Sequence, residues 1–260
     1  MTPRGEPYIP PLKRINYRSD LRIIKKAPPS EKRRIYGRRL GRPLNPARQK
    51  AIDELLPRLS YLEEVLQHST PFDPRTDFSP TTEKLICEIG FGDGDHLAGM
   101  MHQYDDKTAF IGAEPYINGM SAFLKQLQEE NLDQRRIKVW MDDAIRLLEK
   151  FTDHCLDAIY VLNPDPWPKA RHHKRRIISQ ENLDLFARLL KPGADLIMTT
   201  DVDDLAAWMV TEASNHPDFL WTAKSRLDWR ELPKDWIKTK YELKGKAAGR
   251  QQTYLLFKRH

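Results

Sequence analysis

The segment Leu156-Asp-Ala-Ile-Tyr-Val-Leu162 leads directly into Asn163-Pro-Asp-Pro-Trp-Pro-Lys169. The first part is an apolar run of the length that a buried strand requires. Three prolines in five positions exclude a helix from the second part and remove backbone donors that a sheet would use. The sequence therefore predicts a strand that ends in a stiff, extended turn. This turn presents the carboxylate of Asp165 and the ring of Trp167.

A dense group of cations follows this turn. Five Lys or Arg occur within eight residues, at Lys169, Arg171, Lys174, Arg175 and Arg176. A rigid carboxylate and ring backed by cations suits a flat base that is attached to a phosphate chain. Taken alone, the segment also fits a proline-rich surface turn followed by a solvated charged stretch. The rest of the chain has to decide between these two interpretations.

Strand-like and helix-like segments alternate from residue 82 onward. We expect strands near 85–87, 109–113, 137–140, 156–162 and 194–199, and a last antiparallel pair near 218–222 and 253–258. Helices are expected at 96–103, 117–127, 144–151 and 180–190, and Asp201 can cap a further one. This alternation predicts an α/β fold with a doubly wound, mostly parallel seven-stranded sheet, in one domain over residues 81–260.

The first 80 residues differ in composition and are expected to form a basic extension. Residues 1–50 carry 15 Lys or Arg against 3 acidic residues, whereas the remainder has a net charge of −6. Proline and charge dominate residues 1–44, so we expect much of this stretch to be disordered until it binds a partner. Asn45-Pro46 then predicts the start of a helix that stops near Pro57.

This charge asymmetry predicts a polyanion-binding arm. Arg38 and Arg39 stand beside Tyr36, and cations mixed with an aromatic ring are typical of contacts to phosphates and bases. A nuclear or mitochondrial targeting sequence is the competing interpretation.

Several classes of protein are disfavoured by the composition. No apolar run approaches the roughly 18 residues of a membrane span, and no signal-peptide core stands near the start. Cys87 and Cys155 lie in apolar strand-like runs without metal-ligand spacing. We therefore expect a cytoplasmic protein with buried free thiols, the alternative being a disulfide or metal site. His172-His173 suggests RNA contact or plain surface rather than a metal site, because no third ligand is apparent.

Acidic residues stand at four successive predicted strand ends, where parallel sheets bind their ligands. They are Glu88, Glu114, the pair Asp142 and Asp143, and Asp165. Each of them could instead be a turn residue or a helix cap. A glycine-rich loop at 88–94 contains Gly90 and Gly92, but Asp95 replaces the last glycine of the G-x-G-x-x-G dinucleotide fingerprint.

An acidic rim repels the phosphates of NAD or ATP. It favours a ligand with ribose hydroxyls, an ammonium group and a sulfonium, and S-adenosylmethionine has all three. The carboxylate of Glu114 can accept both hydroxyls of a ribose, and Asp142 or Asp143 can lie near an adenine edge. The sequence thus predicts an S-adenosylmethionine site without a metal.

These residues together resemble the class I methyltransferases, whose fold is Rossmann-like. More narrowly, Pro164–Lys169 and the cations that follow look like the tRNA (guanine-N7)-methyltransferase family, as do Thr199–Asp201 and Thr239–Glu242. The resemblance covers about residues 80–260, and Gly37–Arg42 is similar to the arm of some bacterial members. Asn163 departs from the apolar or aromatic residue that members often have, and the spacing from Asp143 to Asp165 is about one residue shorter than in some.

The resemblance implies a methyl transfer to guanine 46 in the variable loop of tRNA, and it implies site residues. Those for the donor are Glu88, Gly90, Gly92, Glu114, Asp143 and Asp165, with Asp142 as a rival to Asp143. Those that face the RNA or the acceptor guanine are Lys169, Asp201, Thr239 and Glu242. The RNA backbone is expected to contact Arg171, Lys174, Arg175, Arg176, Arg38 and Arg39.

The chemistry of guanine N7 suits this set of residues. N7 has a free in-plane lone pair, so its methylation needs no general base. Holding N7 in line with the methyl group supplies most of the rate, and a carboxylate, Asp165 or Asp201, can favour the charge that develops on the purine. Asp165 is the predicted catalytic residue.

Two other functions remain open. Asn163-Pro-Asp-Pro-Trp167 is similar to the N-P-P-Y-type motif of enzymes that methylate exocyclic amino groups, although Asp stands in place of the second Pro. A non-catalytic RNA-binding protein on the same scaffold is the other alternative. The oligomeric state is left open between monomer and homodimer.

Overall fold

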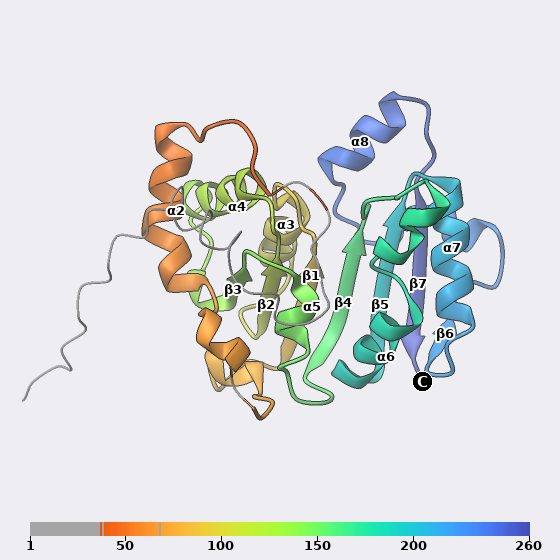
Figure 1. Cartoon of the computed structure of the whole chain (residues 1–260), viewed down its shortest axis with the longest axis horizontal. Coiled ribbons are helices and arrows are strands. Elements are labelled where there is room, and N and C mark those ends of the chain that lie inside the picture. Colours follow the sequence, from red (N-terminus) through yellow and green to blue (C-terminus); the bar gives the residue numbers. More distant parts are fainter. Residues whose placement is uncertain (1–36, 38, 68) are drawn as a thin grey trace, which may run out of the picture. The chain divides into compact units, whose positions relative to one another are not determined.

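The computed structural model describes residues 37, 39–67 and 69–260, which form one compact unit around a seven-stranded sheet (Figure 1). The strands are β1 (Lys84–Ile89), β2 (Thr108–Ala113), β3 (Ile137–Trp140), β4 (Leu156–Leu162), β5 (Leu190–Thr200), β6 (Phe219–Trp221) and β7 (Thr253–Arg259). The helices are α2 (Pro46–Leu59), α3 (Asp95–Gln103), α4 (Ile117–Glu129), α5 (Ala144–Leu148), α6 (Gln180–Leu189), α7 (Asp203–Ser214) and α8 (Lys240–Ala247). The predicted arm at residues 1–36, together with Arg38, lies outside the described residues.

The strands follow the order β3-β2-β1-β4-β5-β7-β6. The first five are parallel to one another, and β7 is antiparallel to both of its neighbours. The first strand in the sequence, β1, lies in the middle of the sheet. The chain then adds β2 and β3 on one side of β1 and the remaining strands on the other side. The predicted doubly wound, mostly parallel sheet is therefore confirmed, with its carboxyl edge at the top of Figure 1, where β4 points upward and β7 downward.

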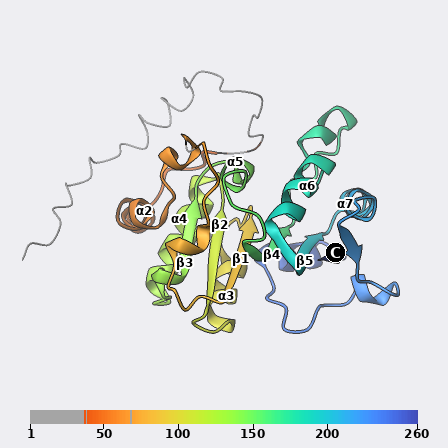
Figure 2. The ribbon, with the colours of Figure 1, turned by 90° about the horizontal axis from the view of Figure 1, so that it is seen from below.

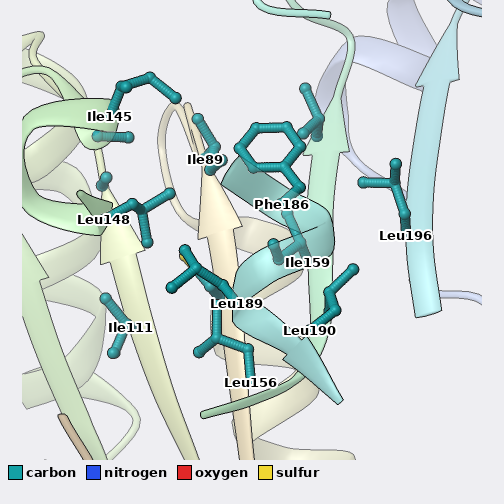
Figure 3. Close-up of a cluster of buried hydrophobic side chains, with 14 of the residues drawn as sticks. Ile89, Ile111, Ile145, Leu148, Leu156, Ile159, Phe186, Leu189, Leu190 and Leu196 are labelled. Carbon is teal, nitrogen blue, oxygen red and sulfur yellow. The ribbon is translucent and has the colours of Figure 1, made fainter. Parts of the chain in front are cut away.

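Helices cover both faces of this sheet. In Figure 2, α5 and α6 lie on one side of the strands and α3 on the other, while α2 packs beside α4 and β3. Figure 3 shows apolar side chains of α5 and α6 gathered over β1, β4 and β5. Phe186, Leu189 and Ile159 are fully buried there, so this layer fixes the position of the strand ends.

The segment before β1 packs on the sheet. Asn45 caps α2 as predicted and accepts a hydrogen bond from the backbone N–H of Arg48 (2.9 Å). The helix does not stop near Pro57 but continues to Leu59, because Leu55, Leu56 and Leu59 are buried and stabilise its last turn. Single bridges then join Ser60 to Val139 and Phe72 to Phe151.

Other boundaries differ slightly from the prediction. α5 ends at Leu148 rather than near residue 151, and β5 begins at Leu190 rather than near residue 194, with a register shift against β4. Cys87 and Cys155 are buried free thiols, and burial raises the pKa of Cys155 to about 12. None of the helices in the described part of the chain is long and apolar enough to cross a membrane.

Candidate active site

The loop after β1 forms the floor of the candidate site. Its backbone is tied to the neighbouring strand end, because the N–H of Gly90 donates to the carbonyl of Ala113 (2.7 Å). Gly90 has a φ of +73°, and a Cβ placed on it would meet nothing within 4 Å. Glycine is therefore needed for the conformation, and the space in front of Gly90 is open to a ligand.

Glu114 closes β2 beside this loop. Its two carboxylate oxygens accept hydrogen bonds from the backbone N–H groups of Gly92 and Tyr116, both at 2.8 Å. Burial raises the pKa of Glu114 to about 7, and the nearby carboxylates of Asp165 and Asp93 act in the same direction. The predicted donor residues Gly92, Glu114 and Asp165 are thus brought together at one edge of the sheet.

Both acids after β3 have partners within the protein. Asp143 is the N-cap of α5 and accepts a hydrogen bond from the N–H of Ile145 (3.0 Å). Asp142 is largely buried between two guanidinium groups, at 3.0 Å from Arg39 and 2.8 Å from Arg146. The helix-cap interpretation therefore holds for Asp143, and Asp142 is held by two ion pairs.

Glu88, at the end of β1, is more deeply buried than a direct ligand contact requires. It is only 2 % exposed, and its Oε2 lies 3.0 Å from Nδ1 of His96, itself 3 % exposed. No local feature singles out His96, because nothing in the neighbouring residues indicates that the first turn of α3 meets the end of β1.

The proline-rich turn after β4 is held in an unusual backbone conformation. Asn163 and Trp167 have φ values of +47° and +42°. Residues other than glycine rarely adopt such positive φ values, and those that do are concentrated at functional sites. Asp165 between them is exposed, and within the described residues its carboxylate has no hydrogen-bond or ion-pair partner. Partial desolvation by neighbouring atoms raises its pKa above the ordinary aspartate value.

The cations after this turn separate into two groups. Lys169, Arg171 and Lys174 are exposed on and next to a 3₁₀ helix (Ala170–Arg175), and Arg175 lies with its guanidinium 5.0 Å from the ring centroid of Trp167. The pKa of His172 is lowered by desolvation and by the surrounding cations. These residues form the positive surface that the sequence predicts.

Arg176 has a different position, which corrects its assignment to the RNA backbone. It is 3 % exposed, its Nε donates to the carbonyl of Pro166 (3.0 Å), and its guanidinium pairs with Asp204 and stacks on Trp208 at 4.9 Å. A side chain buried in this way cannot reach a phosphate. Arg176 instead anchors the proline-rich turn to α7.

Three of the four predicted acceptor residues, Asp201, Thr239 and Glu242, lie at α8 and just after β5, whereas Lys169 lies in the turn after β4. Thr239 caps α8, because its Oγ1 accepts from the N–H of Glu242 (3.1 Å). The carboxylate of Glu242 is buried and accepts from Trp236 Nε1 (3.0 Å) and Tyr254 Oη (2.6 Å). No helix was expected here, although Thr239 and Glu242 have the spacing of a helix N-terminus. The bonds to Glu242 come from residues 6 and 12 positions away, and no local signal indicates them. In Figure 1, α8 lies above the carboxyl edge of the sheet.

Asp201 is not the predicted helix cap. The N-cap of α7 is Val202, and the carboxylate of Asp201 accepts instead from Nε of Arg250 (2.7 Å). A Cβ on Gly245 would lie 2.5 Å from Oδ2 of Asp201, so the glycine lets α8 approach this carboxylate closely. Asp201 and the acceptor residues of α8 are therefore neighbours.

Residues 39–42 of the N-terminal extension lie against the start of α4, after the carboxyl end of β2. The carbonyl of Arg39 accepts from the N–H of Ile117 (3.2 Å), and the carbonyl of Arg42 accepts from Asn118 Nδ2 (3.0 Å). A Cβ on Gly41 would clash with Asn118 and the Tyr116 hydroxyl. Residues 39–42 are thus held on the start of α4, which no local sequence signal indicates.

The end of this segment also reaches the proline-rich turn. A Cβ on Gly37 would lie 3.5 Å from Oδ2 of Asp165. Arg39, predicted to contact RNA, is instead paired with Asp142, and Arg38 is not described. Among the described residues, no group of three or more His, Cys, Asp or Glu is arranged to hold a metal ion.

Comparisons with known proteins show which sequences and folds this chain resembles. The profile of a family described as "Putative methyltransferase" matches residues 82–255. The tRNA (guanine-N(7)-)-methyltransferase of Rhodospirillum rubrum is 40 % identical over 231 residues, covering 89 % of each chain. That of Rhizobium meliloti is 38 % identical over 225 residues, covering 86 % of this chain and 94 % of its own. Among solved structures, the 16S rRNA methyltransferase KamB is similar in fold, with a TM-score of 0.50, 13 % identity and coverage of 70 % and 94 %.

Proposed function

Because the chain belongs to the tRNA (guanine-N(7)-)-methyltransferase family, we propose that it transfers a methyl group from S-adenosylmethionine to N7 of a guanine in tRNA, at position 46 of the variable loop. The observation that carries this proposal is the separation of charge at the carboxyl edge of the sheet. Carboxylates surround the open space at Gly90, and exposed cations stand beside it on residues 169–175. A cationic donor suits the first environment and a polyanionic acceptor the second.

The residues present fit the donor. Gly90 leaves room for a ligand against the backbone, and the buried carboxylate of Glu114 beside it can turn from two backbone N–H groups to two ribose hydroxyls. Asp143, or Asp142 next to it, would lie toward the adenine. Glu88 would support the glycine loop without touching the donor directly, because its carboxylate is buried against His96.

The main task of the protein in this reaction is to position the donor and the guanine relative to each other. The donor supplies a methyl group bound to a sulfonium, and the N7 lone pair needs no base to attack it. The side chains have to hold N7 about 3–3.5 Å from the methyl carbon, in line with sulfur. A carboxylate in the plane of the base then stabilises the positive charge that the purine acquires.

Asp165 suits this last task better than Asp201. The carboxylate of Asp201 is already paired with Arg250 at 2.7 Å, whereas that of Asp165 has no partner within the described residues. The rigid turn also restricts Asp165, since Asn163 and Trp167 fix the backbone on either side of it. We therefore assign Asp165 to the guanine and to the charge that develops on it.

The side chains that contact the rest of the tRNA are assigned from their exposure to solvent. Lys169, Arg171, Lys174 and Arg175 form the surface for the RNA backbone, and the basic arm adds further phosphate contacts. Asp201, Thr239 and Glu242 form the opposite wall around the base. A cytoplasmic location accords with the two buried free thiols.

Methylation of an exocyclic amino group is less compatible with Asn163. In that chemistry the side-chain oxygen has to accept from the amino group, but Oδ1 of Asn163 accepts from Nε2 of Gln252 at 2.8 Å. The decisive experiment is nucleoside analysis of tRNA after incubation with the protein and labelled S-adenosylmethionine. We expect label in 7-methylguanosine. Label confined to adenosine or cytidine derivatives would refute the proposal, and absence of both label and S-adenosylmethionine binding would favour the non-catalytic alternative.

A further inference from the structure

His96 is a buried titratable side chain that the proposed reaction does not use. It lies in the first turn of α3, directly after the glycine loop, and its Nδ1 is 3.0 Å from Oε2 of Glu88. A carboxylate that is 2 % exposed is costly unless it is paired in this way. The pair therefore ties the start of α3 to the strand end beside Gly90.

The ring of His96 also contacts the connection between β6 and β7. Its centroid lies 5.3 Å from that of Trp236. Two further contacts join α3 to the same stretch: a Cβ on Gly99 would lie 2.6 Å from Cγ2 of Ile237, and Gln103 Nε2 donates to the carbonyl of Asp235 (3.1 Å). Positions 96, 99 and 103 share one face of a helix, so the connection is docked along α3.

Trp236 continues the chain of contacts to the acceptor side. Its Nε1 donates to Oε2 of Glu242 (3.0 Å), and its ring packs edge-on against Tyr254, whose hydroxyl donates to Oε1 of the same carboxylate. Glu242 in turn stands in the first turn of α8, capped by Thr239. An unbroken series of contacts thus runs from Glu88, at the donor loop, to Glu242.

We infer that His96 is a positioning residue that links the donor loop to the placement of α8. The inference rests on the proposed function, which puts the donor at Gly90 and the guanine beside Thr239 and Glu242. A donor that fixes the glycine loop also fixes the first turn of α3, and the His96 ring passes this constraint to Trp236. By reciprocity, tRNA must then strengthen donor binding by the same factor as the donor strengthens tRNA binding.

The test is the affinity for S-adenosylhomocysteine, measured by calorimetry with and without saturating tRNA. For the wild-type chain we expect tRNA to lower the Kd at least about fivefold, the lower end of ordinary coupling. For His96→Ala we expect the two Kd values to agree within about twofold. The coupling is the ratio of the two Kd values for one variant, so a change in donor binding caused by the loss of the partner of Glu88 does not enter it.

His216→Ala is the matched control. His216 is also 3 % exposed, also pairs with a carboxylate (3.1 Å to Asp184), and also packs on a ring (5.3 Å to Phe219), but it lies between α7 and β6. It should keep the wild-type coupling, so a general loss of stability is distinguished from a loss of linkage. If His96→Ala does not fold, Trp236→Phe keeps a ring against His96, removes the bond to Glu242, and should reduce the coupling by the same route.

The outcomes separate the two levels of the proposal. A wild-type chain that binds no S-adenosylhomocysteine overturns the proposed function and this inference with it. A wild-type chain that binds both ligands without coupling, or a folded His96→Ala variant with wild-type coupling, overturns the inference alone.

Discussion

Arg39 Nη2 lies 3.0 Å from Oδ1 of Asp142, which joins the N-terminal segment to the end of β3. The other carboxylate oxygen accepts from Arg146 (2.8 Å), and the Asp142 side chain is only 9 % exposed. An arginine from the basic extension is therefore part of the wall of the candidate donor site. Its guanidinium is paired with a carboxylate of the protein, which it shares with Arg146.

Arg39→Ala should weaken donor binding and leave the salt dependence of tRNA binding unchanged. Loss of a partly buried pair predicts a Kd for S-adenosylhomocysteine that rises by about three- to tenfold. Arg171→Ala is the control, because Arg171 is exposed. It should leave donor binding intact and reduce the slope of log K against log salt by slightly less than one. Equal slope changes in the two variants would mean that Arg39 contacts phosphate.

Donor binding should depend on the ionisation of Glu114. Its pKa is raised to about 7 by burial, so the carboxyl is protonated below that pH and ionised above it. Only the carboxylate can accept two ribose hydroxyls, and affinity for S-adenosylhomocysteine should therefore rise with pH. Calorimetry should show binding about tenfold weaker at pH 6 than at pH 8. Glu114→Gln should bind weakly at both pH values, and a pH-independent Kd in the wild-type chain would contradict the role of Glu114.

Asp165→Asn should lower turnover far more than it lowers RNA affinity. The substitution keeps the size of the side chain but removes the charge that stabilises the methylated purine, which predicts a fall in kcat of about 100-fold or more. The Kd for tRNA, measured by filter binding, should stay within about threefold because phosphate contacts dominate it. Asp153→Asn, an exposed carboxylate in the loop before β4, should change neither quantity. Loss of tRNA binding with unchanged kcat would show that Asp165 contributes to RNA binding and not to the methyl transfer.

Arg176→Ala should destabilise the fold. It removes the hydrogen bond to Pro166 and the stacking on Trp208, so we expect the free energy of unfolding in urea to fall by about 2 kcal/mol. Lys174→Ala, at an exposed position two residues earlier, should change it by less than about 0.5 kcal/mol. Lys174→Ala should instead reduce the salt slope of tRNA binding. A reduced salt slope for Arg176→Ala without a loss of stability would mean that Arg176 contacts the RNA backbone after all.

Much of the architecture was predictable because its causes are local. The apolar run Leu156–Leu162 and the prolines after it specify a strand and its end without reference to any other part of the chain. The same holds for the Asn45 cap and for the glycine loop at 88–94. Since parallel strands bring their carboxyl ends to one edge, acidic residues at four strand ends could be placed at one site before any contact was known.

Predictions from the sequence were wrong mainly where tertiary contacts outweighed local propensity. α2 runs through Pro57 because its last turn is buried. α8 was missed although Thr239-Lys-Tyr-Glu242 has the spacing of a helix N-terminus, whereas the bonds of Glu242 to Trp236 and Tyr254 depend on the tertiary structure. Asp201 was a plausible cap by residue type, but Arg250, 49 residues away in the sequence, holds its carboxylate instead.

The sequence by itself determined the order of strands and helices apart from α8, the acidic strand ends and the cation-rich stretch after β4, since periodicity, turn chemistry and charge can be read residue by residue. Only the tertiary structure decided which charged groups are free. It buries Arg176 under the proline-rich turn, pairs Arg39 with Asp142, and places His96 between Glu88 and Trp236. The physical reason is that a charge finds its partner by distance in space, and the partners of these residues are 8 to 140 positions away along the chain.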